Sequence, residues 1–232
     1  MNVVITGASK GIGKAVAEKF ASHGADLFLC SRHIEDTAAW QGQLMNKYNI
    51  AVSCMNTDMS VKDEVLAFSK KVLDAFDGID VLVNNAGLFE PGSVHNEPEG
   101  TLERMIDVNL YSAYHLTRAL LPLMMKHRKG HVFNLCSIAS AAAYKNGGAY
   151  SISKFALYGF SKNLREELKT YNIKVTAVLP GAAYTDSWSG SGIDPKRIME
   201  AKDVADMIWA ASQLSPQACV EDILMRPQRG DL

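Results

Sequence analysis

Short apolar runs alternate with longer segments of helical period along the whole chain, and no other feature restricts the fold as much. The apolar runs are continuous, as expected for strands of a parallel sheet that helices cover on both faces. Because β-α-β crossovers are right-handed, this order predicts an α/β fold with a doubly wound parallel sheet of about seven strands. The predicted strands are residues 2–6, 26–30, 51–56, 81–84, 131–136, 174–179 and 222–226. The predicted helices are residues 12–22, 34–47, 62–76, 101–126, 149–170 and 202–212.

One long irregular segment interrupts this pattern at residues 182–197, which are rich in Gly, Ser and Ala. It follows the sixth predicted strand, at the carboxyl edge where open α/β sheets bind ligands. Because long loops in compact domains are often lids or binding loops, the segment is predicted to be a substrate lid, with a passive surface loop as the alternative. No repeat, low-complexity tract or long linker divides the chain, so residues 1–232 are predicted to form a single domain.

The composition favours a small-molecule ligand over a polyanion or a membrane. The chain has 24 basic and 25 acidic side chains, a net charge of -1, and no basic stripe that would suggest nucleic acid. No apolar stretch approaches the ~20 residues that span a bilayer, and the first residues read directly as a strand, which predicts a cytoplasmic protein. Scattered cysteines (Cys30, Cys54, Cys136, Cys219) indicate reduced thiols, and the six histidines form no ligand pair that would suggest a metal.

A glycine-rich turn joins the first strand to the first helix in the run Thr6-Gly7-Ala8-Ser9-Lys10-Gly11-Ile12-Gly13. Its glycines allow a tight turn and a close approach of the backbone to a pyrophosphate, while the helix N-terminus supplies N–H groups and a favourable dipole. The spacing is TGxxxGxG rather than GxGxxG. The turn therefore predicts a Rossmann-like dinucleotide site formed by Gly7, Ser9, Lys10, Gly11, Ile12 and Gly13.

The residues after the second strand bear on the choice of dinucleotide. An NAD site usually places an acidic residue here to bind the ribose 2′-hydroxyl, whereas this chain has Ser31 and Arg32, with no acid before Glu35. Arg32, helped by Ser31 and Lys10, could bind a 2′-phosphate through charge-assisted hydrogen bonds. The pattern favours NADP(H) over NAD(H), and the alternative is that Arg32 is a solvated surface charge.

Tyr150 and Lys154 lie four residues apart on a predicted helix and therefore share one face of it. A tyrosine with a pKa of about 10 is a poor acid or base at neutral pH, and a nearby cation lowers that pKa. Spacing alone is also compatible with an ordinary amphipathic face. The pair becomes an acid/base candidate only in combination with the dinucleotide turn.

The motifs jointly resemble those of the short-chain dehydrogenase/reductase (SDR) family, in its compact branch. The resemblance rests on TGxxxGxG at residues 6–13, Asn84-Asn85-Ala86-Gly87 after the fourth strand, and YxxxK at residues 150–154. Supporting matches are Asp58, Asn109, Ser137 and the run from Pro180 to Thr185. The matches occur in order and cover nearly the whole chain.

The resemblance implies a catalytic set of Asn109, Ser137, Tyr150 and Lys154. Tyr150 would exchange a proton with the substrate oxygen, which Ser137 would also bind. Lys154 would lower the pKa of Tyr150 and bind the nicotinamide ribose, and Asn109 would hold a proton-relaying water. Alternatively, Ser137 simply ends a strand and Asn109 is a buried hydrogen-bonding kink in a helix.

The resemblance also implies further cofactor contacts. The residues are Asp58, Asn85, Gly87 and Thr185, together with Tyr150 and Lys154. Asp58 would contact the adenine, although it could instead be the N-cap of the next helix. The lid is short compared with those of many relatives, and family members commonly form homodimers or homotetramers through the helices predicted at 101–126 and 149–170.

These observations predict an NADP(H)-dependent oxidoreductase that transfers hydride between nicotinamide and a carbonyl or alcohol of a small or medium substrate. Candidate pocket residues are Leu88, Ile138, Tyr144, Ala183, Tyr184 and Trp188. The alternatives are an NAD-dependent alcohol dehydrogenase of the same fold and a non-catalytic dinucleotide-binding sensor. An epimerase or dehydratase is disfavoured because such chains carry a substantial C-terminal substrate domain.

Overall fold

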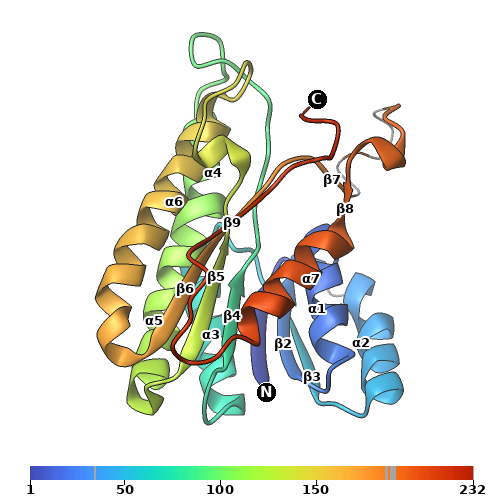
Figure 1. Ribbon diagram of the computed structural model, residues 1–232, viewed down its shortest axis with the longest axis vertical. Helices are drawn as coiled ribbons and strands as arrows, with labels where there is room; N and C mark the ends of the chain where they lie inside the picture. Colours follow the sequence, from blue (N-terminus) through green and yellow to red (C-terminus); the bar gives the residue numbers. More distant parts are fainter. Residues whose placement is uncertain (34, 186–187, 189–191, 232) are drawn as a thin grey trace.

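A parallel sheet of seven strands forms the centre of the computed structural model, which describes residues 1–33, 35–185, 188 and 192–231 (Figure 1). Its order is β3-β2-β1-β4-β5-β6-β9, and each pair of neighbours is parallel. The strands are β1 (Asn2–Thr6), β2 (Asp26–Ser31), β3 (Val52–Asn56), β4 (Val81–Asn84), β5 (Gly130–Leu135), β6 (Ile173–Pro180) and β9 (Asp222–Met225). β7 (Ala183–Tyr184) and β8 (Met199–Glu200) form a separate parallel pair. The strand order reverses between β1 and β4, the position at which open α/β sheets bind ligands.

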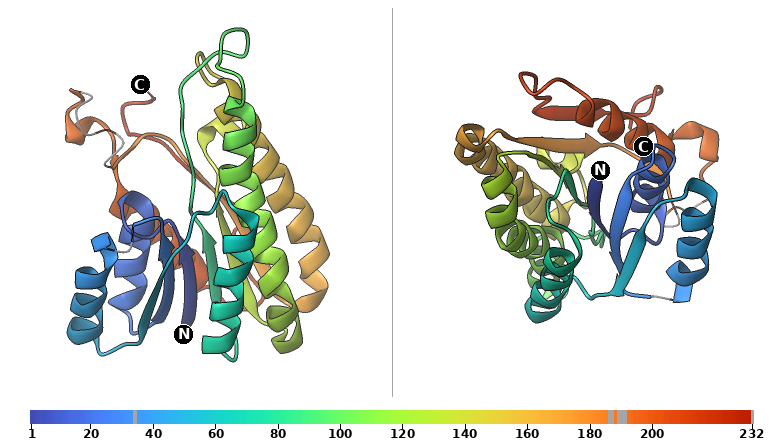
Figure 2. Two further views of the ribbon diagram at one scale, coloured as in Figure 1. Left: turned by 180° about the vertical axis from the view of Figure 1, so that it is seen from behind. Right: turned by 90° about the horizontal axis from the view of Figure 1, so that it is seen from below.

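Helices cover both faces of the sheet (Figures 1 and 2). α1, α2 and α7 lie on one face, and α3, α5 and α6 lie on the other. The helices are α1 (Gly11–Ala21), α2 (Glu35–Tyr48), α3 (Lys62–Ala75), α4 (Thr101–Ile106), α5 (Ser112–His127), α6 (Gly148–Leu168) and α7 (Ala201–Ser212). No helix in the described part of the chain is long and apolar enough to span a membrane.

The continuous apolar runs exist because each central strand contributes to two cores. In β1, Val3 and Ile5 are fully buried against α1 and α7, while Val4 is fully buried against α3 and α5. Successive side chains of a strand point to opposite faces, so a strand covered on both sides needs apolar residues at consecutive positions. The two cores hold the sheet rigid beneath the loops at its carboxyl edge.

The seven predicted strands are confirmed, with bounds that differ by at most one residue. The predicted helix at 101–126 is helical over its whole length, but a π-helical turn (Asp107–Tyr111) separates α4 from α5. The other predicted helices agree to within two residues, and the predicted start at residue 34 lies outside the described residues.

The predicted lid at 182–197 is only partly described, since residues 186, 187 and 189–191 lie outside the described residues. Its described parts include β7 and a 3-10 turn (Pro195–Arg197). The Met199 N–H donates to the Ala182 carbonyl at 3.1 Å, which ties the two ends of the segment together. The residues at which the segment begins and ends are therefore neighbours in space.

Candidate active site

Tyr150 and Ser137 meet at the carboxyl edge of the sheet from two different elements. Ser137 follows β5 after one residue, and Tyr150 lies in the first turn of α6. The Ser137 hydroxyl lies near enough to the Tyr150 phenol to lower its pKa. Ser137 Oγ also accepts from the Ala139 N–H at 3.1 Å, which fixes the hydroxyl at the start of a 3-10 turn (Ile138–Ser140). Two hydroxyls are thus available to a single oxygen atom of a substrate.

Lys154 is buried one helical turn beyond Tyr150. Its Nζ donates to the carbonyl oxygen of Leu135, the last residue of β5, at 2.7 Å. A side chain built on Gly87 would lie 3.4 Å from Lys154 Nζ and 3.2 Å from Asn109 Oδ1. Because Gly87 has no side chain, a space remains between these two polar groups. Together with Ser137 and Tyr150, they bring all four predicted catalytic residues to one region.

The pKa of Tyr150 differs from the sequence-based expectation. Burial raises it to about 12, and the nearby Ser137 hydroxyl only partly opposes this. The expected lowering by Lys154 is absent because its ammonium bonds to Leu135 and lies 5.9 Å from the centroid of the Tyr150 ring. Burial also lowers the pKa of Lys154 to about 8. The phenol is therefore protonated at neutral pH, which suits a proton donor.

Asn109 lies in the π-helical turn and uses its whole amide in hydrogen bonds. Its Oδ1 accepts from the Leu88 N–H at 2.7 Å, and its Nδ2 donates to the Leu88 carbonyl at 2.9 Å and to Ser153 Oγ at 2.8 Å. The geometry matches the alternative reading of Asn109 as a buried hydrogen-bonding kink. Ser153, which sequence reasoning missed, links this turn to α6 beside Lys154.

The glycine-rich turn after β1 is shaped by contacts that exclude side chains. Gly7 and Gly11 have φ values of 64° and 54°, in the left-handed region that favours glycine. A Cβ on Gly13 would overlap the Gly7 carbonyl oxygen and Asn85 Nδ2. Asn85 Nδ2 in turn donates to the carbonyls of Thr6 and Gly7 at 2.9 and 3.0 Å. Asn85 therefore holds the turn from the neighbouring strand.

The start of α1 presents backbone N–H groups beside this turn. Its N-cap residue, Lys10, makes no side-chain capping hydrogen bond, and half-buried Ser9, Gly11 and Ile12 surround the position. Thr185 lies against the turn, since a Cβ on Gly11 would be 3.0 Å from Thr185 Cγ2. The N-terminus of α1, flanked by Thr185, is therefore a suitable binding site for a phosphate group.

The end of β2 carries the residues predicted to select the cofactor. Ser31 is buried, and its hydroxyl donates to the His33 carbonyl at 3.0 Å, whereas Arg32 is exposed. The pKa of Asp58 is lowered by hydrogen bonds from the Ser60 N–H and hydroxyl and by the charge of Arg32. Asp58 is not the N-cap of α3, which is Val61. Arg32 and Asp58 therefore lie on the same side of the site.

The sequence profile of the family described as short chain dehydrogenase matches residues 1–194. The chain belongs to the short-chain dehydrogenase/reductase family. It is 30% identical over 238 residues to a sepiapterin reductase of Chlorobaculum tepidum, covering 99% of this chain and 97% of the relative.

Solved structures of short-chain dehydrogenases match the whole fold. One is a metagenomic short-chain oxidoreductase in complex with NADP, 32% identical with a TM-score of 0.85, covering 98% of this chain and 97% of the other. Another is an alcohol dehydrogenase from the archaeon Thermococcus sibiricus complexed with 5-hydroxy-NADP, 28% identical with a TM-score of 0.89, covering 98% and 96%. The protein is thus an oxidoreductase of the class that acts on CH–OH donors with NAD(P) as acceptor.

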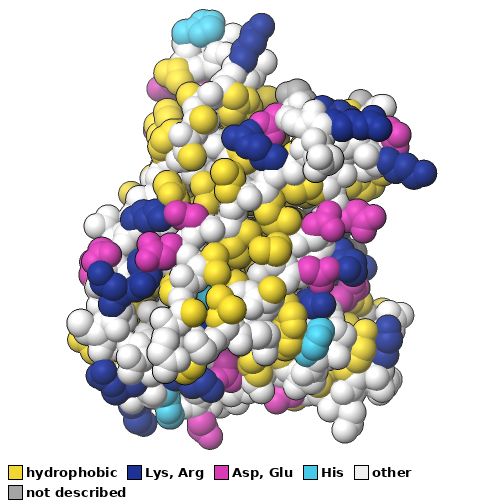
Figure 3. All heavy atoms as spheres, viewed as in Figure 1, with side chains coloured by type: hydrophobic (Ala, Val, Ile, Leu, Met, Phe, Trp, Pro, Cys, Tyr) yellow, Lys and Arg dark blue, Asp and Glu magenta, His cyan; other side chains and the backbone are white. Residues whose placement is uncertain are grey.

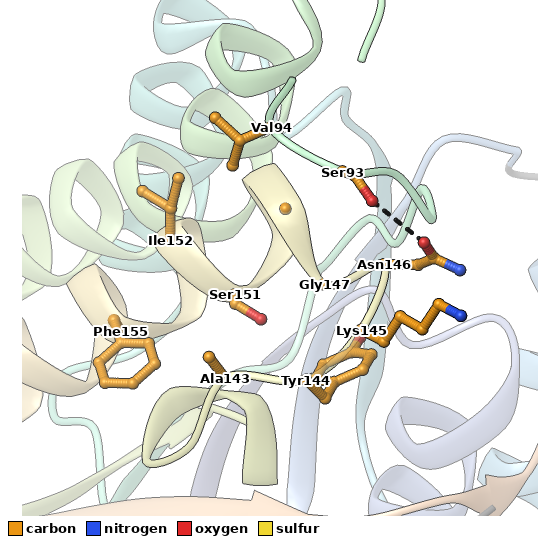
Figure 4. A pocket seen from close by; sticks show the side chains of 11 residues that line it. Ser93, Val94, Ala143, Tyr144, Lys145, Asn146, Gly147, Ser151, Ile152 and Phe155 are labelled. Atoms are coloured by element: carbon orange, nitrogen blue, oxygen red, sulfur yellow. Dashed lines mark hydrogen bonds between the residues drawn. The ribbon is translucent and has the colours of Figure 1, made fainter. Parts of the chain in front are cut away.

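This short-chain dehydrogenase has an open groove of about 560 Å³ beside the start of α6 (Figure 4). Tyr144, Ser151, Ile152 and Phe155 line it, and of the predicted pocket residues only Tyr144 does so. Among the others, Ala183 is buried, Tyr184 is exposed, and Leu88, Ile138 and Trp188 are half-buried.

Sequence reasoning missed Phe89, whose ring packs edge-on against Tyr150 with centroids 4.8 Å apart. Phe89 is 51% exposed, so part of its ring packs on Tyr150 while the rest faces solvent. Its position two residues after the Asn-Asn-Ala-Gly motif could have drawn attention to it. The structure adds it to the walls of the site.

No disulfide joins the cysteines in the described part of the chain. Burial raises the pKa of Cys30 to about 12 and that of Cys136 to about 11, which makes both weak nucleophiles at neutral pH. Within the described residues, no three His, Cys, Asp or Glu side chains form a group that could hold a metal ion. The polar groups gathered at this site are the hydroxyls of Ser137 and Tyr150 and the buried ammonium of Lys154.

Proposed function

We propose that the protein transfers hydride between NADP(H) and a carbonyl or alcohol of a small or medium substrate, with Tyr150 as the acid/base. The observation that carries this proposal is the meeting of the Tyr150 phenol and the Ser137 hydroxyl beside buried Lys154. The nicotinamide, when bound, supplies or accepts the hydride. The protein's share is to orient the reactants and provide a polar, partly dry environment.

Each side chain has a role in reduction that follows from its surroundings. Ser137 would donate a hydrogen bond to the carbonyl oxygen and fix its position. Tyr150 would then transfer its phenolic proton to that oxygen as negative charge develops. Because burial holds the pKa of Tyr150 at about 12, the phenol is already in the form that reduction needs. The same phenol would have to lose its proton before it could act as the base in alcohol oxidation.

Lys154 and Asn109 would support this transfer from behind the tyrosine. The ammonium of Lys154, held against the Leu135 carbonyl, would bind the ribose hydroxyls of the cofactor. Asn109 Oδ1, beside the space left by Gly87, would accept a hydrogen bond from a proton-relaying water. The half-buried ring of Tyr150 would regain its proton by this route.

The glycine turn and α1 would bind the pyrophosphate through residues Gly7, Ser9, Lys10, Gly11, Ile12, Gly13 and Thr185. Asn85 and Gly87 would border the cofactor from β4, and Asp58 would contact the adenine. Exposed Arg32, with Ser31, would bind a 2′-phosphate and so favour NADP(H) over NAD(H). The NADP-bound relatives support this preference.

Residues 1–232 would act as one catalytic domain, with residues 182–197 as the substrate lid. The contact of Thr185 with the turn at Gly11 and the exposure of Tyr184 support this role.

We also propose a homodimer or homotetramer. Apolar side chains gather around the edge strand β9 on the face shown in Figure 3, and Leu224 in that strand is 60% exposed. An exposed apolar edge strand is usually covered by a partner. Light scattering coupled to size-exclusion chromatography should give a mass of two or four chains, and a mass of one chain would contradict this.

A substrate panel tests the proposed reaction. Sepiapterin, L-sorbose, benzaldehyde and acetophenone would be assayed by the oxidation of NADPH and of NADH, with Tyr150→Phe as the control. We expect at least one carbonyl compound to be reduced, with NADPH preferred and with the variant inactive. Equal reduction by the Tyr150→Phe variant would contradict the role of the phenol.

A further inference from the structure

The loop between β4 and α4 lies alongside the turn that precedes the catalytic helix α6. Gly92 and Gly147 form an isolated parallel β-bridge, and the Gly92 N–H donates to the Asn146 carbonyl at 3.1 Å. Ser93 Oγ donates to Asn146 Oδ1 at 3.1 Å, the contact drawn as a dashed line in Figure 4. Segments more than 50 residues apart in the sequence are therefore joined just before α6 begins.

Glu97, in the same loop, reaches the first turn of α6 with its carboxylate. Its Oε1 accepts from the Ala149 N–H at 2.9 Å, and Ala149 is buried. The first N–H groups of a helix have no partner within the helix, and a negative charge there is favoured by the helix dipole. The N-cap residue of α6 is Gly147, which has no side chain to provide this acceptor. Glu97 therefore provides the cap from a distance of 52 residues in the sequence.

The glycines around this carboxylate show that the contact is closely fitted. A Cβ on Gly148 would overlap Glu97 Oε1, and a Cβ on Gly92 would lie 2.6 Å from Glu97 Cγ. Both positions are glycine, so the side chain of Glu97 occupies the space that their side chains would fill. The carboxylate is held against the backbone rather than resting on the surface.

The capped N–H belongs to the residue directly before Tyr150, and the same loop also supplies Phe89, which packs against the tyrosine ring. One loop thus fixes the catalytic tyrosine at its backbone, through Glu97, and at its ring, through Phe89. A shift of the first turn of α6 would move the phenol relative to Ser137, which is fixed independently by the turn after β5.

We propose that Glu97 is a positioning residue for the proton transfer: by capping the Ala149 N–H, its carboxylate holds Tyr150 within reach of Ser137 and the substrate oxygen. This inference rests on the proposed function of Tyr150. It predicts that the loss of Glu97 lowers the rate of the chemical step more than it weakens the binding of either substrate or cofactor.

The test compares three substitutions at Glu97 with a matched control in the same loop. Glu97→Ala removes the acceptor, Glu97→Gln keeps a neutral acceptor of the same length, and Glu97→Asp keeps the charge but withdraws it by one methylene. Glu99→Ala removes an exposed carboxylate two residues away. Each variant would be assayed with the panel compound that the wild type reduces fastest, and NADPH binding would be measured by fluorescence titration.

We expect kcat to fall at least about tenfold in Glu97→Ala, with the Kd for NADPH and the substrate KM each within about threefold of wild type. Glu97→Gln should retain kcat to within about threefold, because its amide oxygen can still accept from the Ala149 N–H. Glu99→Ala should match the wild type.

Three results would decide against the proposal or its basis. If kcat of Glu97→Ala stays within about twofold of wild type while only the melting temperature falls, the cap is merely structural and the inference is overturned. If Glu97→Ala does not fold, Glu97→Asp and Glu97→Gln are compared instead. A lower kcat in Glu97→Asp than in Glu97→Gln supports the proposal, and equal kcat values overturn it. Inactivity of the wild type on every probe overturns the proposed function and this inference together, whereas a fully active Glu97→Ala overturns the inference alone.

Discussion

His131 is a buried histidine of β5 whose protonation should destabilise the fold. Its Nε2 lies 2.7 Å from Thr176 Oγ1, and the Thr176 hydroxyl donates its own proton to the Val220 carbonyl. Nε2 must therefore carry the hydrogen, and Nδ1 is bare. Nδ1 is buried with no hydrogen-bond partner in the described part of the chain, and the ring stacks on Phe133 at 3.9 Å. A proton on Nδ1 would place a charge in an apolar core.

The magnitude follows from the pKa of His131 in the folded and unfolded chain. Burial, helped by the charge of Lys174, lowers it from 6.5 to about 3. Below pH 6.5, His131 binds a proton in the unfolded chain but not in the folded chain. The stability that neutral His131 allows is therefore fully present above pH 6.5 and is lost progressively towards pH 3. By linkage, the free energy of unfolding should fall by about 2 kcal/mol between pH 7.5 and pH 5 on account of this residue alone. For a domain of this size, that corresponds to a drop in Tm of roughly 4–8 °C.

Urea unfolding at pH 7.5 and pH 5 would measure this effect in the wild type and in His131→Gln, which keeps a donor for Thr176 but cannot titrate. The variant should be less stable at pH 7.5, but its stability should fall by about 2 kcal/mol less than that of the wild type on acidification. His95→Gln, the same change on an exposed loop residue, should retain the wild-type pH dependence. Parallel pH dependences for the wild type and His131→Gln would refute the reasoning.

Three further predictions concern the site. Arg32→Asp should raise the KM for NADPH by one to two orders of magnitude and leave the KM for NADH nearly unchanged, and equal effects on both would contradict a 2′-phosphate contact. Gly13→Ala should abolish cofactor binding in fluorescence titrations, because its Cβ would overlap the Gly7 carbonyl and Asn85 Nδ2; NADPH affinity equal to wild type would contradict the proposed turn geometry. Lys154→Met should abolish activity yet stabilise the fold by about 1 kcal/mol at pH 7. The lowered pKa of the buried ammonium, about 8 instead of 10.5, costs about 3 kcal/mol at this pH, slightly more than the bond to the Leu135 carbonyl contributes. A lower Tm for this variant would contradict that balance.

Local pattern was enough to predict the sheet and its dinucleotide turn. Strands such as β1 are apolar at consecutive positions because both faces are covered, so their sequence identifies them without reference to distant residues. The glycines at 7, 11 and 13 are likewise required by local backbone geometry and by one close approach. Features of this kind are encoded within a few residues of each other.

Features that depend on distant contacts escaped prediction. The kink at Asn109 could be offered only as an alternative, because the side chain's hydrogen bonds reach Leu88 and Ser153, which lie 21 and 44 residues away. The ammonium of Lys154 bonds to a strand carbonyl rather than acting directly on Tyr150. The four-residue spacing of Tyr150 and Lys154 does not predict this hydrogen-bond partner. The cap that Glu97 provides could not be predicted either, because it acts on a helix that begins 51 positions later in the sequence. The sequence predicted the elements that carry Asn109, Ser137, Tyr150 and Lys154, but not the pKa values of Tyr150 and Lys154.

The most direct test of the central claim is the single-turnover reduction of a carbonyl compound by bound NADPH in the wild type and in Tyr150→Phe. The ring of the variant can still pack against Phe89, so only the phenolic proton is removed. Because Tyr150 is the proposed proton donor, the rate of NADPH oxidation should fall by at least about 100-fold while the Kd for NADPH changes by less than threefold. An unchanged single-turnover rate in Tyr150→Phe would show that another group supplies the proton and would contradict the account.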